Sequence, residues 1–228
     1  MLTFGSLFTG GVREHGGGFD VGLIAAGFTP RWEVEITRGR SVVDYGARNL
    51  VAVDLICGGP PSTRTSALSR LQGARTNETL WPEMLRIVAE LLPAWVLVEQ
   101  PRSVDPAIVC RWAAELQRIG YGVSGRIVNS AHWLPQQRAR WYLVGRLGAI
   151  GVELRDRLYA HGERMARAHV PGAARLRFDG DCADCLPGGI YSRVSARRAA
   201  LVAAGNAVSV PVAQWLGEQI WRVHHDVR

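Results

Sequence analysis

The sequence contains no lysine, and all 27 of its basic residues are arginine. Against 20 acidic residues this gives a formal net charge of +7 at pH 7. Such an excess favours an anionic partner, of which nucleic acid is the first candidate. Because the planar guanidinium group can bond two acceptors at once, arginine suits contacts to phosphate and guanine. An ordinary basic protein without such a partner is the alternative.

Long apolar runs are absent as well. No stretch reaches the roughly 18 residues that a membrane-spanning helix needs, which argues against a membrane partner. No basic segment followed by an apolar one opens the sequence, so we expect no secretion. Cysteine is scarce, and four residues in a chain of this length do not suggest a disulfide scaffold. We therefore expect a cytoplasmic protein in a reducing setting.

The sequence does contain enough apolar material for a core. Hydrophobic residues make up 47% of its 228 residues, which suits one moderate domain, with or without a small appendage. Short apolar stretches predict strands at residues 2–8, 31–36, 52–57, 95–99, 121–129 and 140–145. Helical spacing predicts helices at residues 19–26, 80–92, 109–119, 195–204 and 212–223. This alternation predicts an α/β fold with crossover connections.

Two features near the N-terminus are typical of a nucleotide-like ligand. A glycine-rich turn runs from Thr9 to Gly18, between the first predicted strand and the first predicted helix. Such a turn lets a ligand approach the backbone and presents helix N–H groups to an anion, although a simple surface turn is the alternative. Glu35 ends the second predicted strand, where a carboxylate can bond both hydroxyls of a ribose or simply face solvent.

Polar residues also follow later apolar strands. Glu99 comes after four apolar residues, which makes it a candidate for a perturbed pKa and a role in a site. A capping or ion-pairing glutamate is the alternative. Arg138 and Arg140 alternate along a predicted strand and so point to one face, where both can reach the same ligand. An exposed basic strand is the alternative there.

Six segments, in this order along the chain, resemble motifs of the DNA cytosine-5 methyltransferase family. They are Phe8-Thr9-Gly10 with Gly17-Gly18-Phe19, then Glu35, the loop from Gly58 to Ser66, Glu99-Gln100-Pro101, the block from Gln136 to Arg140, and Gly205-Asn206-Ala207-Val208. The resemblance covers residues 1–146 and 195–228. It implies a Rossmann-like, S-adenosylmethionine-dependent methyltransferase fold with DNA as the partner.

The resemblance also implies roles for individual residues. The family flips a cytosine out of the duplex, adds a cysteine thiolate at C6 and transfers a methyl group to C5. By this resemblance Glu99 engages the base, Arg138 and Arg140 support it, and Ser62 occupies the attacking position. The implied contacts to S-adenosyl-L-methionine are Phe8, Thr9, Gly10, Gly17, Gly18, Phe19, Glu35, Pro61, Leu80, Asn206 and Val208.

The attacking position departs from the family pattern. Ser62 stands where the family has cysteine, and Thr63 stands where glutamine follows it. A thiol ionises readily and sulfur adds well to an electron-poor ring, whereas a hydroxyl is a poor nucleophile without a positioned base. Cys57 lies five residues earlier, at a strand end, and is interpreted as a core residue.

The cofactor side departs from the pattern too. Extra residues separate Gly10 from Gly17, which stretches the glycine-rich turn. Only 18 residues separate Glu35 from Asp54, too few for the family's usual extra helix and strand. The family's adenine-contacting aspartate has no good match here, and Asp44 is a weak substitute.

Residues 147–194 are interpreted as a short target-recognition-like lobe between the two parts of the methyltransferase-like domain, 1–146 and 195–228. This segment is far shorter than the family's usual recognition region. It contains Cys182 and Cys185, with His161 and His169 before them, but a single Cys-x-x-Cys pair is a weak signal and we expect no metal.

Three hypotheses follow from the motifs and their departures. The first is a diverged methyltransferase that keeps nucleic-acid binding but has weak or lost methylation activity. The second is an enzyme that modifies a pyrimidine by altered chemistry. The third is a non-catalytic subunit that pairs with an active methyltransferase.

Overall fold

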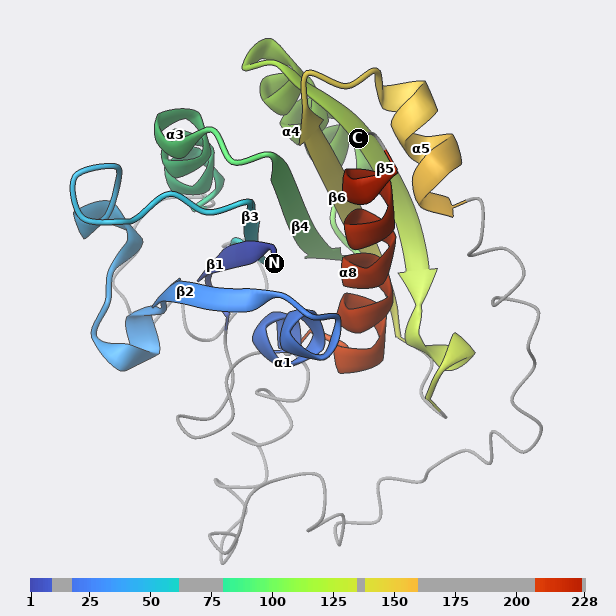
Figure 1. The fold of residues 1–228 in the computed structure, drawn as a ribbon, viewed down its shortest axis with the longest axis horizontal. Helices are drawn as coiled ribbons and strands as arrows, with labels where there is room; N and C mark the ends of the chain where they lie inside the picture. Colours follow the sequence, from blue (N-terminus) through green and yellow to red (C-terminus); the bar gives the residue numbers. More distant parts are fainter. Residues whose placement is uncertain (10–17, 62–79, 135–137, 160–207, 227–228) are drawn as a thin grey trace, which may run out of the picture.

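The computed structural model describes residues 1–9, 18–61, 80–134, 138–159 and 208–226, which form a six-stranded sheet flanked by helices (Figure 1). The strands are β1 (Thr3–Leu7), β2 (Thr29–Val34), β3 (Leu55–Gly58), β4 (Trp95–Pro101), β5 (Tyr121–Asn129) and β6 (Ala139–Leu147). The helices are α1 (Gly18–Ala25), α3 (Trp81–Leu91), α4 (Pro106–Arg118), α5 (Gly151–Tyr159) and α8 (Val210–His225). Short 3-10 helices are η1 (Ile36–Arg38), η2 (Val42–Asp44) and η3 (Ser130–His132).

The strand order in the sheet is β2-β1-β3-β4-β6-β5. Strands β2, β1, β3 and β4 are parallel, and β6 lies between β4 and β5 and runs antiparallel to both. Parallel neighbours need crossover connections, which is why helices alternate with these strands. The predicted Rossmann-like α/β fold is confirmed.

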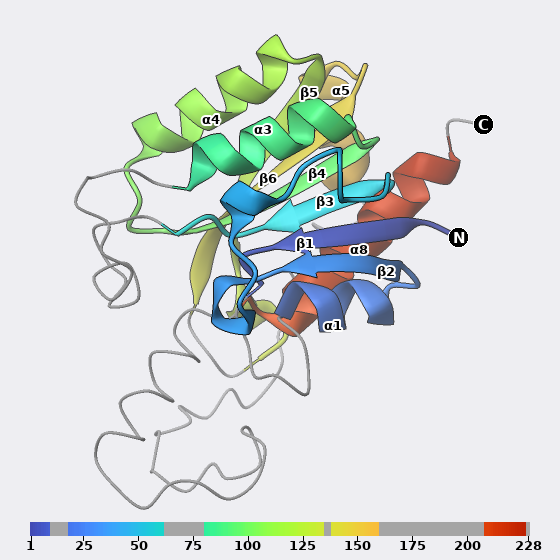
Figure 2. The same ribbon diagram turned by 90° about the vertical axis from the view of Figure 1, so that its left-hand side faces the viewer.

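Two layers of helices cover the sheet (Figure 2). Helices α1, α5 and α8 lie on one face, where Leu23, Leu158 and Leu216 join a single apolar core. Helices α3 and α4 lie on the other face, where Met84 and Trp112 join a second core. Both faces of the sheet are therefore covered by helices and shielded from water, as is typical of a mostly parallel sheet.

Helix α1 packs closely against α8, although the two are far apart in the sequence (Figure 1). Glycines make this approach possible. A Cβ on Gly22 would lie 2.6 Å from the Cβ of Ala213, and one on Gly217 would lie 2.8 Å from the Cβ of Ala26. The C-terminal helix is thereby fixed beside the start of the first helix.

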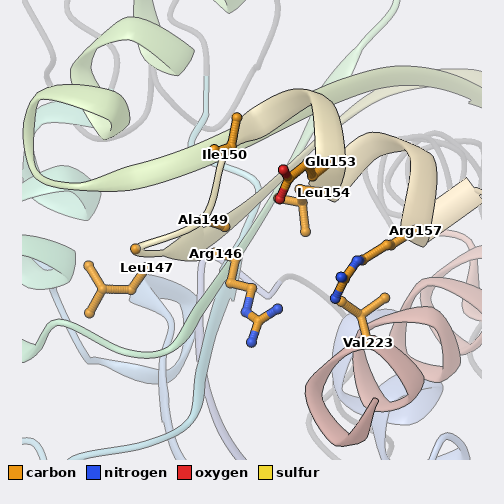
Figure 3. Close-up of a pocket in the computed structure, with 9 residues that line it drawn as sticks. Arg146, Leu147, Ala149, Ile150, Glu153, Leu154, Arg157 and Val223 are labelled. Atoms are coloured by element: carbon orange, nitrogen blue, oxygen red, sulfur yellow. The ribbon is translucent and has the colours of Figure 1, made fainter. Parts of the chain in front are cut away.

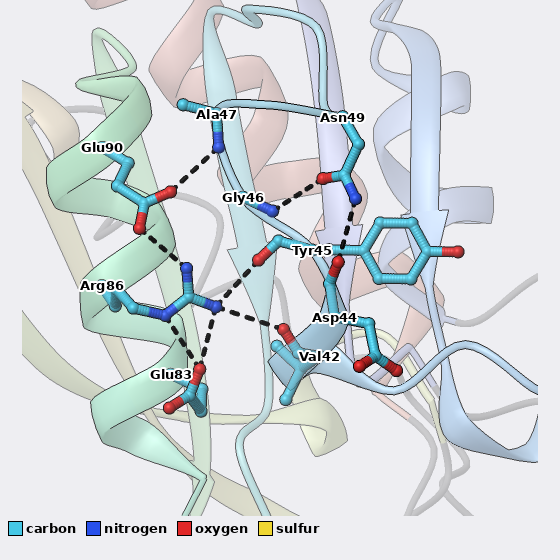
Figure 4. A network of polar contacts seen from close by, with 9 residues as sticks. All are labelled: Val42, Asp44, Tyr45, Gly46, Ala47, Asn49, Glu83, Arg86 and Glu90. Carbon is cyan, nitrogen blue, oxygen red and sulfur yellow. Dashed lines mark hydrogen bonds and ion pairs between the residues drawn. The ribbon is translucent and has the colours of Figure 1, made fainter.

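The connection between β2 and β3 contains only η1 and η2, which confirms that the spacing leaves no room for another helix and strand. Helix α3 holds this connection through Arg86 (Figure 4). The Arg86 guanidinium donates to the carbonyl oxygens of Val42 and Tyr45, at 3.3 and 2.8 Å. It also pairs at 2.8 Å with Glu90, whose second carboxylate oxygen accepts from the Ala47 N–H at 2.9 Å.

Helix α5 was not predicted. It lies within residues 147–194, yet its Leu154 and Leu158 are buried in the core that α1 and α8 share with the sheet. The described start of this segment thus packs on the main sheet. The rest of the predicted lobe, residues 160–194, lies outside the described residues, and so do the predicted helix at 195–204 and the residues Cys182, Cys185, His161 and His169.

Candidate active site

The carboxyl ends of three neighbouring parallel strands meet at one edge of the sheet. Leu7 of β1 pairs with Gly58 of β3, and Gly58 pairs with Val98 of β4. The next residue along β4 is Glu99, and the next after β3 is Gly59. Ligands of open α/β sheets bind at this edge, so the predicted base-binding and cofactor-binding segments share one location.

Glu99 is the central charged group of this edge. Only 6% of its surface is exposed, and its Oε1 lies 2.9 Å from Nε of Arg140. Burial raises the pKa of Glu99 from 4.5 to about 7, against the opposing effects of Arg140 and Arg138. Near neutral pH the carboxyl group is therefore present both with and without its proton, and the protonated form can donate a hydrogen bond.

The charges of Arg138 and Arg140 both act on Glu99. Arg140 lies in β6, and Arg138 lies just before that strand. The N–H of Arg138 donates to Oδ1 of Asn129 at 2.9 Å, and the same oxygen accepts from the Ala131 N–H at 3.1 Å. Burial, followed by the charge of Arg140, lowers the pKa of Arg138. Asn129 thus positions the first arginine, a role that sequence reasoning missed.

The start of the predicted nucleophile loop is bonded to β4. Nε2 of Gln100 donates to the buried carbonyl oxygen of Pro60 at 2.7 Å. A Cβ on Gly59 would lie 3.3 Å from Oε2 of Glu99, so the loop backbone runs directly beside that carboxyl group. Ser62, the predicted attacking position, lies outside the described residues, as does Thr63. Gln100 was not predicted as a site residue, because a glutamine after the glutamate carries no distinctive pattern.

Cys57 is the cysteine nearest to this loop along the chain. It is fully buried in the core, and burial raises the pKa of its thiol well above the usual value. Its interpretation as a core residue is confirmed. A buried, protonated thiol is not available as a nucleophile.

Tyr142 is a further neighbour of Glu99 that sequence reasoning missed. The two residues are paired across β4 and β6, and the tyrosine ring is buried. Burial, followed by the charge of Glu99, raises the pKa of the phenol. Tyr142 continues the alternation of Arg138 and Arg140, so the period of two residues was the signal that could have identified it.

The predicted cofactor residues begin where β1 and β2 end. Phe8 has a positive φ of 55°, and its N–H donates to the Val34 carbonyl at 3.1 Å. Thr9 and Glu35 follow these strand ends, and both are buried. A Cβ on Gly18 would lie 1.8 Å from the carbonyl oxygen of Val208, so the structure brings the first and last predicted cofactor segments together.

The other predicted cofactor residues differ in burial, and some of them lie outside the described residues. Pro61 and Leu80 are half-buried, and Leu80 packs beside the core under α3. Phe19 lies at the start of α1, and its side chain is fully buried in the core. An aromatic residue at the start of a helix gives no sign of which side it faces. Gly10, Gly17 and Asn206 lie outside the described residues.

The residues that remain fit a nucleoside-containing cofactor. Glu35 supplies a buried carboxylate at the end of β2, where ribose hydroxyls can be bonded, and Phe8 follows β1 with its backbone in the left-handed region. The weak substitute Asp44 is exposed, and its backbone carbonyl accepts from Asn49 at 2.9 Å. In the described ranges, no group of three His, Cys, Asp or Glu residues could hold a metal ion, and no helix is long and apolar enough to cross a membrane.

Solved structures similar to the chain include methyltransferases. A prophage-encoded E. coli protein assigned as a DNA modification methyltransferase is 24% identical with a TM-score of 0.49, covering 64% of this chain and 47% of its own. The Dnmt2 methyltransferase of S. pombe is 17% identical with a TM-score of 0.45, covering 68% and 54%. A DNMT2 mutant of Spodoptera frugiperda is 15% identical with a TM-score of 0.47, covering 65% and 50%. The chain spans about half the length of these structures.

No curated protein matches the chain. The sequence model of one family, described as C-5 cytosine-specific DNA methylase, matches residues 37–155. That match takes in more than half of the 228 residues, including both arginines and the glutamate they surround. The chain therefore belongs to the C-5 cytosine-specific DNA methylase family.

Proposed function

We propose that this chain holds a flipped cytosine in DNA as its relatives in the family do, but that its methylation activity is weak or lost because Ser62 replaces the nucleophilic cysteine. The observation that carries the proposal is the ion pair between Glu99 and Arg140, in which burial raises the pKa of Glu99 to about 7. A site built to hold a pyrimidine needs such a group, because a neutral carboxyl can donate to one ring atom and accept from another.

In this proposal the protonated Glu99 donates to N3 of the base, and its carbonyl oxygen accepts from the exocyclic amine. Arg140 stays beside Oε1 of Glu99 and fixes the orientation of the carboxyl group. Arg138, held by Asn129, approaches the base carbonyl or a nearby phosphate. Proton donation to N3 withdraws electrons from the ring, which favours addition at C6.

Addition at C6 requires a nucleophile from residue 62. Gln100 holds the Pro60 carbonyl and Gly59 lies against Glu99, so the loop leads toward the base position. At that position a serine hydroxyl keeps its proton near neutral pH, whereas a cysteine thiol with a free pKa of about 8.5 is partly ionised. The site is therefore proposed to bind and polarise the base without efficient bond formation.

The residues proposed to hold S-adenosyl-L-methionine are Glu35, at the ribose, with Phe8, Thr9, Pro61, Leu80 and Val208 around the ligand. When bound, this cofactor supplies an electrophilic methyl group. The short connection after β2, held by Arg86, replaces the wall that the family builds from an extra helix and strand.

A second candidate function is a non-catalytic DNA-binding subunit that works with an active methyltransferase. It is favoured by the joint replacement of cysteine by Ser62 and of glutamine by Thr63, together with the net charge of +7. A nucleic-acid partner is common to both candidates, since basic residues bind the phosphate backbone without any catalytic step.

The test compares the natural chain with Ser62→Cys and Ser62→Ala, using labelled S-adenosylmethionine and duplex DNA. We expect no more than trace methylation from the natural chain and from Ser62→Ala. Ser62→Cys should gain measurable but incomplete activity, because the cofactor side is also altered. Efficient methylation by the natural chain that is lost in Ser62→Ala would refute the proposal, and full turnover by Ser62→Cys would refute its cofactor part.

Binding is tested separately, so that a lost nucleophile is distinguished from a lost enzyme. Calorimetric titration with S-adenosylmethionine asks whether the cofactor side still works. Duplex DNA with 2-aminopurine beside a cytosine reports base flipping by increased fluorescence. Glu99→Ala should abolish that signal, while Gln117→Ala, at an exposed position of α4, should keep it. DNA binding without cofactor binding or base flipping would favour the non-catalytic subunit.

A further inference from the structure

A cavity of about 330 Å³ opens between the end of β6, the start of α5 and the last turns of α8 (Figure 3). It lies at the opposite end of the sheet from the candidate active site. Arg146, which lines it, pairs with Trp95 at the start of β4, and Glu99 is four residues further along that strand. At roughly 3.3 Å per residue this places the two sites about 13 Å apart along the strand. The cavity is therefore separate from the base-binding edge.

Two arginines from different elements reach into this cavity. Arg146 comes from β6 and Arg157 from α5, and their side chains extend into the cavity from different sides (Figure 3). Among the described residues neither arginine takes part in an ion pair. Burial, followed by the charge of Arg157, lowers the pKa of Arg146, so the two cations repel each other. An anion between them would relieve that repulsion.

Arg146 is held in place by an aromatic ring of the sheet. Its guanidinium carbon lies 5.3 Å from the ring centroid of Trp95, which is fully buried in the sheet. The indole N–H of Trp95 donates to Nδ1 of His224 at 3.1 Å, which fixes the ring. A guanidinium group stacked on a fixed aromatic ring loses little freedom when a ligand binds, so the site is partly pre-organised.

We propose that this cavity is a binding site for a phosphate group, held between Arg146 and Arg157. The two oxygens of a carboxylate suffice for the paired N–H groups of one guanidinium. A phosphate group has more oxygens and up to two negative charges, so two guanidinium groups can bind it at once. The cavity volume lies at the lower end of the range for small-molecule sites, which suits a phosphate group with part of a nucleotide attached.

Glu153 also lines the cavity, and it opposes an anion. It stands four residues before Arg157 on α5, a spacing that allows an ion pair, yet no such pair is formed. The two arginines and this carboxylate together give the lining a net charge of +1. Removing that carboxylate should therefore strengthen phosphate binding, which a purely structural role for the two arginines does not predict.

The test is calorimetric titration of the full chain at constant ionic strength with inorganic phosphate, thymidine 5′-monophosphate, and a short single strand without a terminal phosphate. Arg157→Gln should weaken binding at least tenfold, and Arg157→Lys, which keeps the charge but loses the fork, should weaken it less. Arg155→Gln is the matched control, since Arg155 is an exposed arginine on the same helix paired with Asp156, and it should change binding less than twofold. Glu153→Gln should tighten binding several-fold.

Comparing the affinities of the three ligands shows which kind of phosphate group the site binds. Stronger binding of the monophosphate than of the single strand assigns the site to terminal phosphates, and the reverse order assigns it to the phosphodiester backbone. Both outcomes support the site. Equal losses in Arg155→Gln and Arg157→Gln, no tightening in Glu153→Gln, or no binding by the natural chain at millimolar ligand would overturn it. Because no step depends on Ser62, these results are independent of the methylation test.

Discussion

The base-binding and cofactor-binding halves of the candidate active site are held together in different ways. The base-binding half consists of β4, β6 and residues 59–61. Seven residue pairs join β4 to β6. Two side-chain contacts add to this strand pairing, the Glu99–Arg140 ion pair and the hydrogen bond from Gln100 to Pro60. Each of these contacts joins groups that are mostly withdrawn from water, where an unpaired partner is costly.

The cofactor-binding half consists of β1, β2 and residues 36–50. Its last part contains only two 3-10 helices and depends on the partly exposed side chain of Arg86. Exposed charge pairs contribute little to stability, so this half can tolerate shortening and change. The comparison shows that buried contacts hold the proposed base-binding half together, whereas partly exposed contacts of Arg86 hold the connection of the proposed cofactor-binding half.

The largest expected effect comes from the buried carboxyl group in the base-binding half. Because folding raises the pKa of Glu99 from 4.5 to about 7, its contribution is fully present below pH 4.5 and is lost as the pH rises through 7. Glu99→Gln cannot lose a proton. Between pH 4.5 and 7.5 the unfolding free energy of the natural chain should therefore fall relative to this variant by about 3 kcal/mol, measured by denaturant titration.

Glu153→Gln, which changes an exposed glutamate on α5, is the control, and its pH dependence should follow the natural chain. A difference between Glu99→Gln and the natural chain that stays constant across this range would contradict the buried, proton-binding state of Glu99.

A smaller effect is expected from the contact that holds the loop before residue 62. Gln100→Ala removes the donor to the buried Pro60 carbonyl, and an unsatisfied buried acceptor costs about 2 kcal/mol of unfolding free energy. Gln117→Ala, at an exposed position of α4, should cost less than a quarter of that. Equal losses in the two variants would show that the loop is not bonded to β4 in this way.

The smallest effect is expected in the cofactor-binding half. Arg86→Ala removes the donor to two backbone carbonyls and two glutamates, but its side chain is partly exposed, so we expect a loss of about 1 kcal/mol. Hydrogen exchange should accelerate at the Ala47 amide, whose acceptor Glu90 loses its own partner. Arg111→Ala, on exposed α4, should leave that amide unchanged. A loss larger than that of Gln100→Ala would break the comparison between the two halves.

Much of the fold was predictable because its signals are local. Apolar runs marked each of the six described strands to within a few residues, and helical spacing marked α1, α3, α4 and α8. Helix α5 was missed because its short stretch carries many charged residues and only two buried leucines. Those leucines are apolar enough to pack on the sheet, but too few to reveal a helix in an arginine-rich segment.

The candidate site was predictable where a residue type and a strand end coincide, as at Glu99, Arg138 and Arg140. The supporting residues were not. Gln100, Asn129 and Tyr142 act through partners that lie elsewhere in the sequence.

The sequence by itself determined the α/β alternation, the order of the motifs and the presence of a serine at position 62, because each depends only on residue types and their spacing. Only the tertiary structure decided that Arg140 faces Glu99, that the carboxyl group is buried deeply enough to hold a proton near neutral pH, and that Arg146 and Arg157 converge at the far end of the sheet. These features depend on strand register and helix packing between distant segments, and a pKa follows from the surroundings of a group and not from its place in the chain.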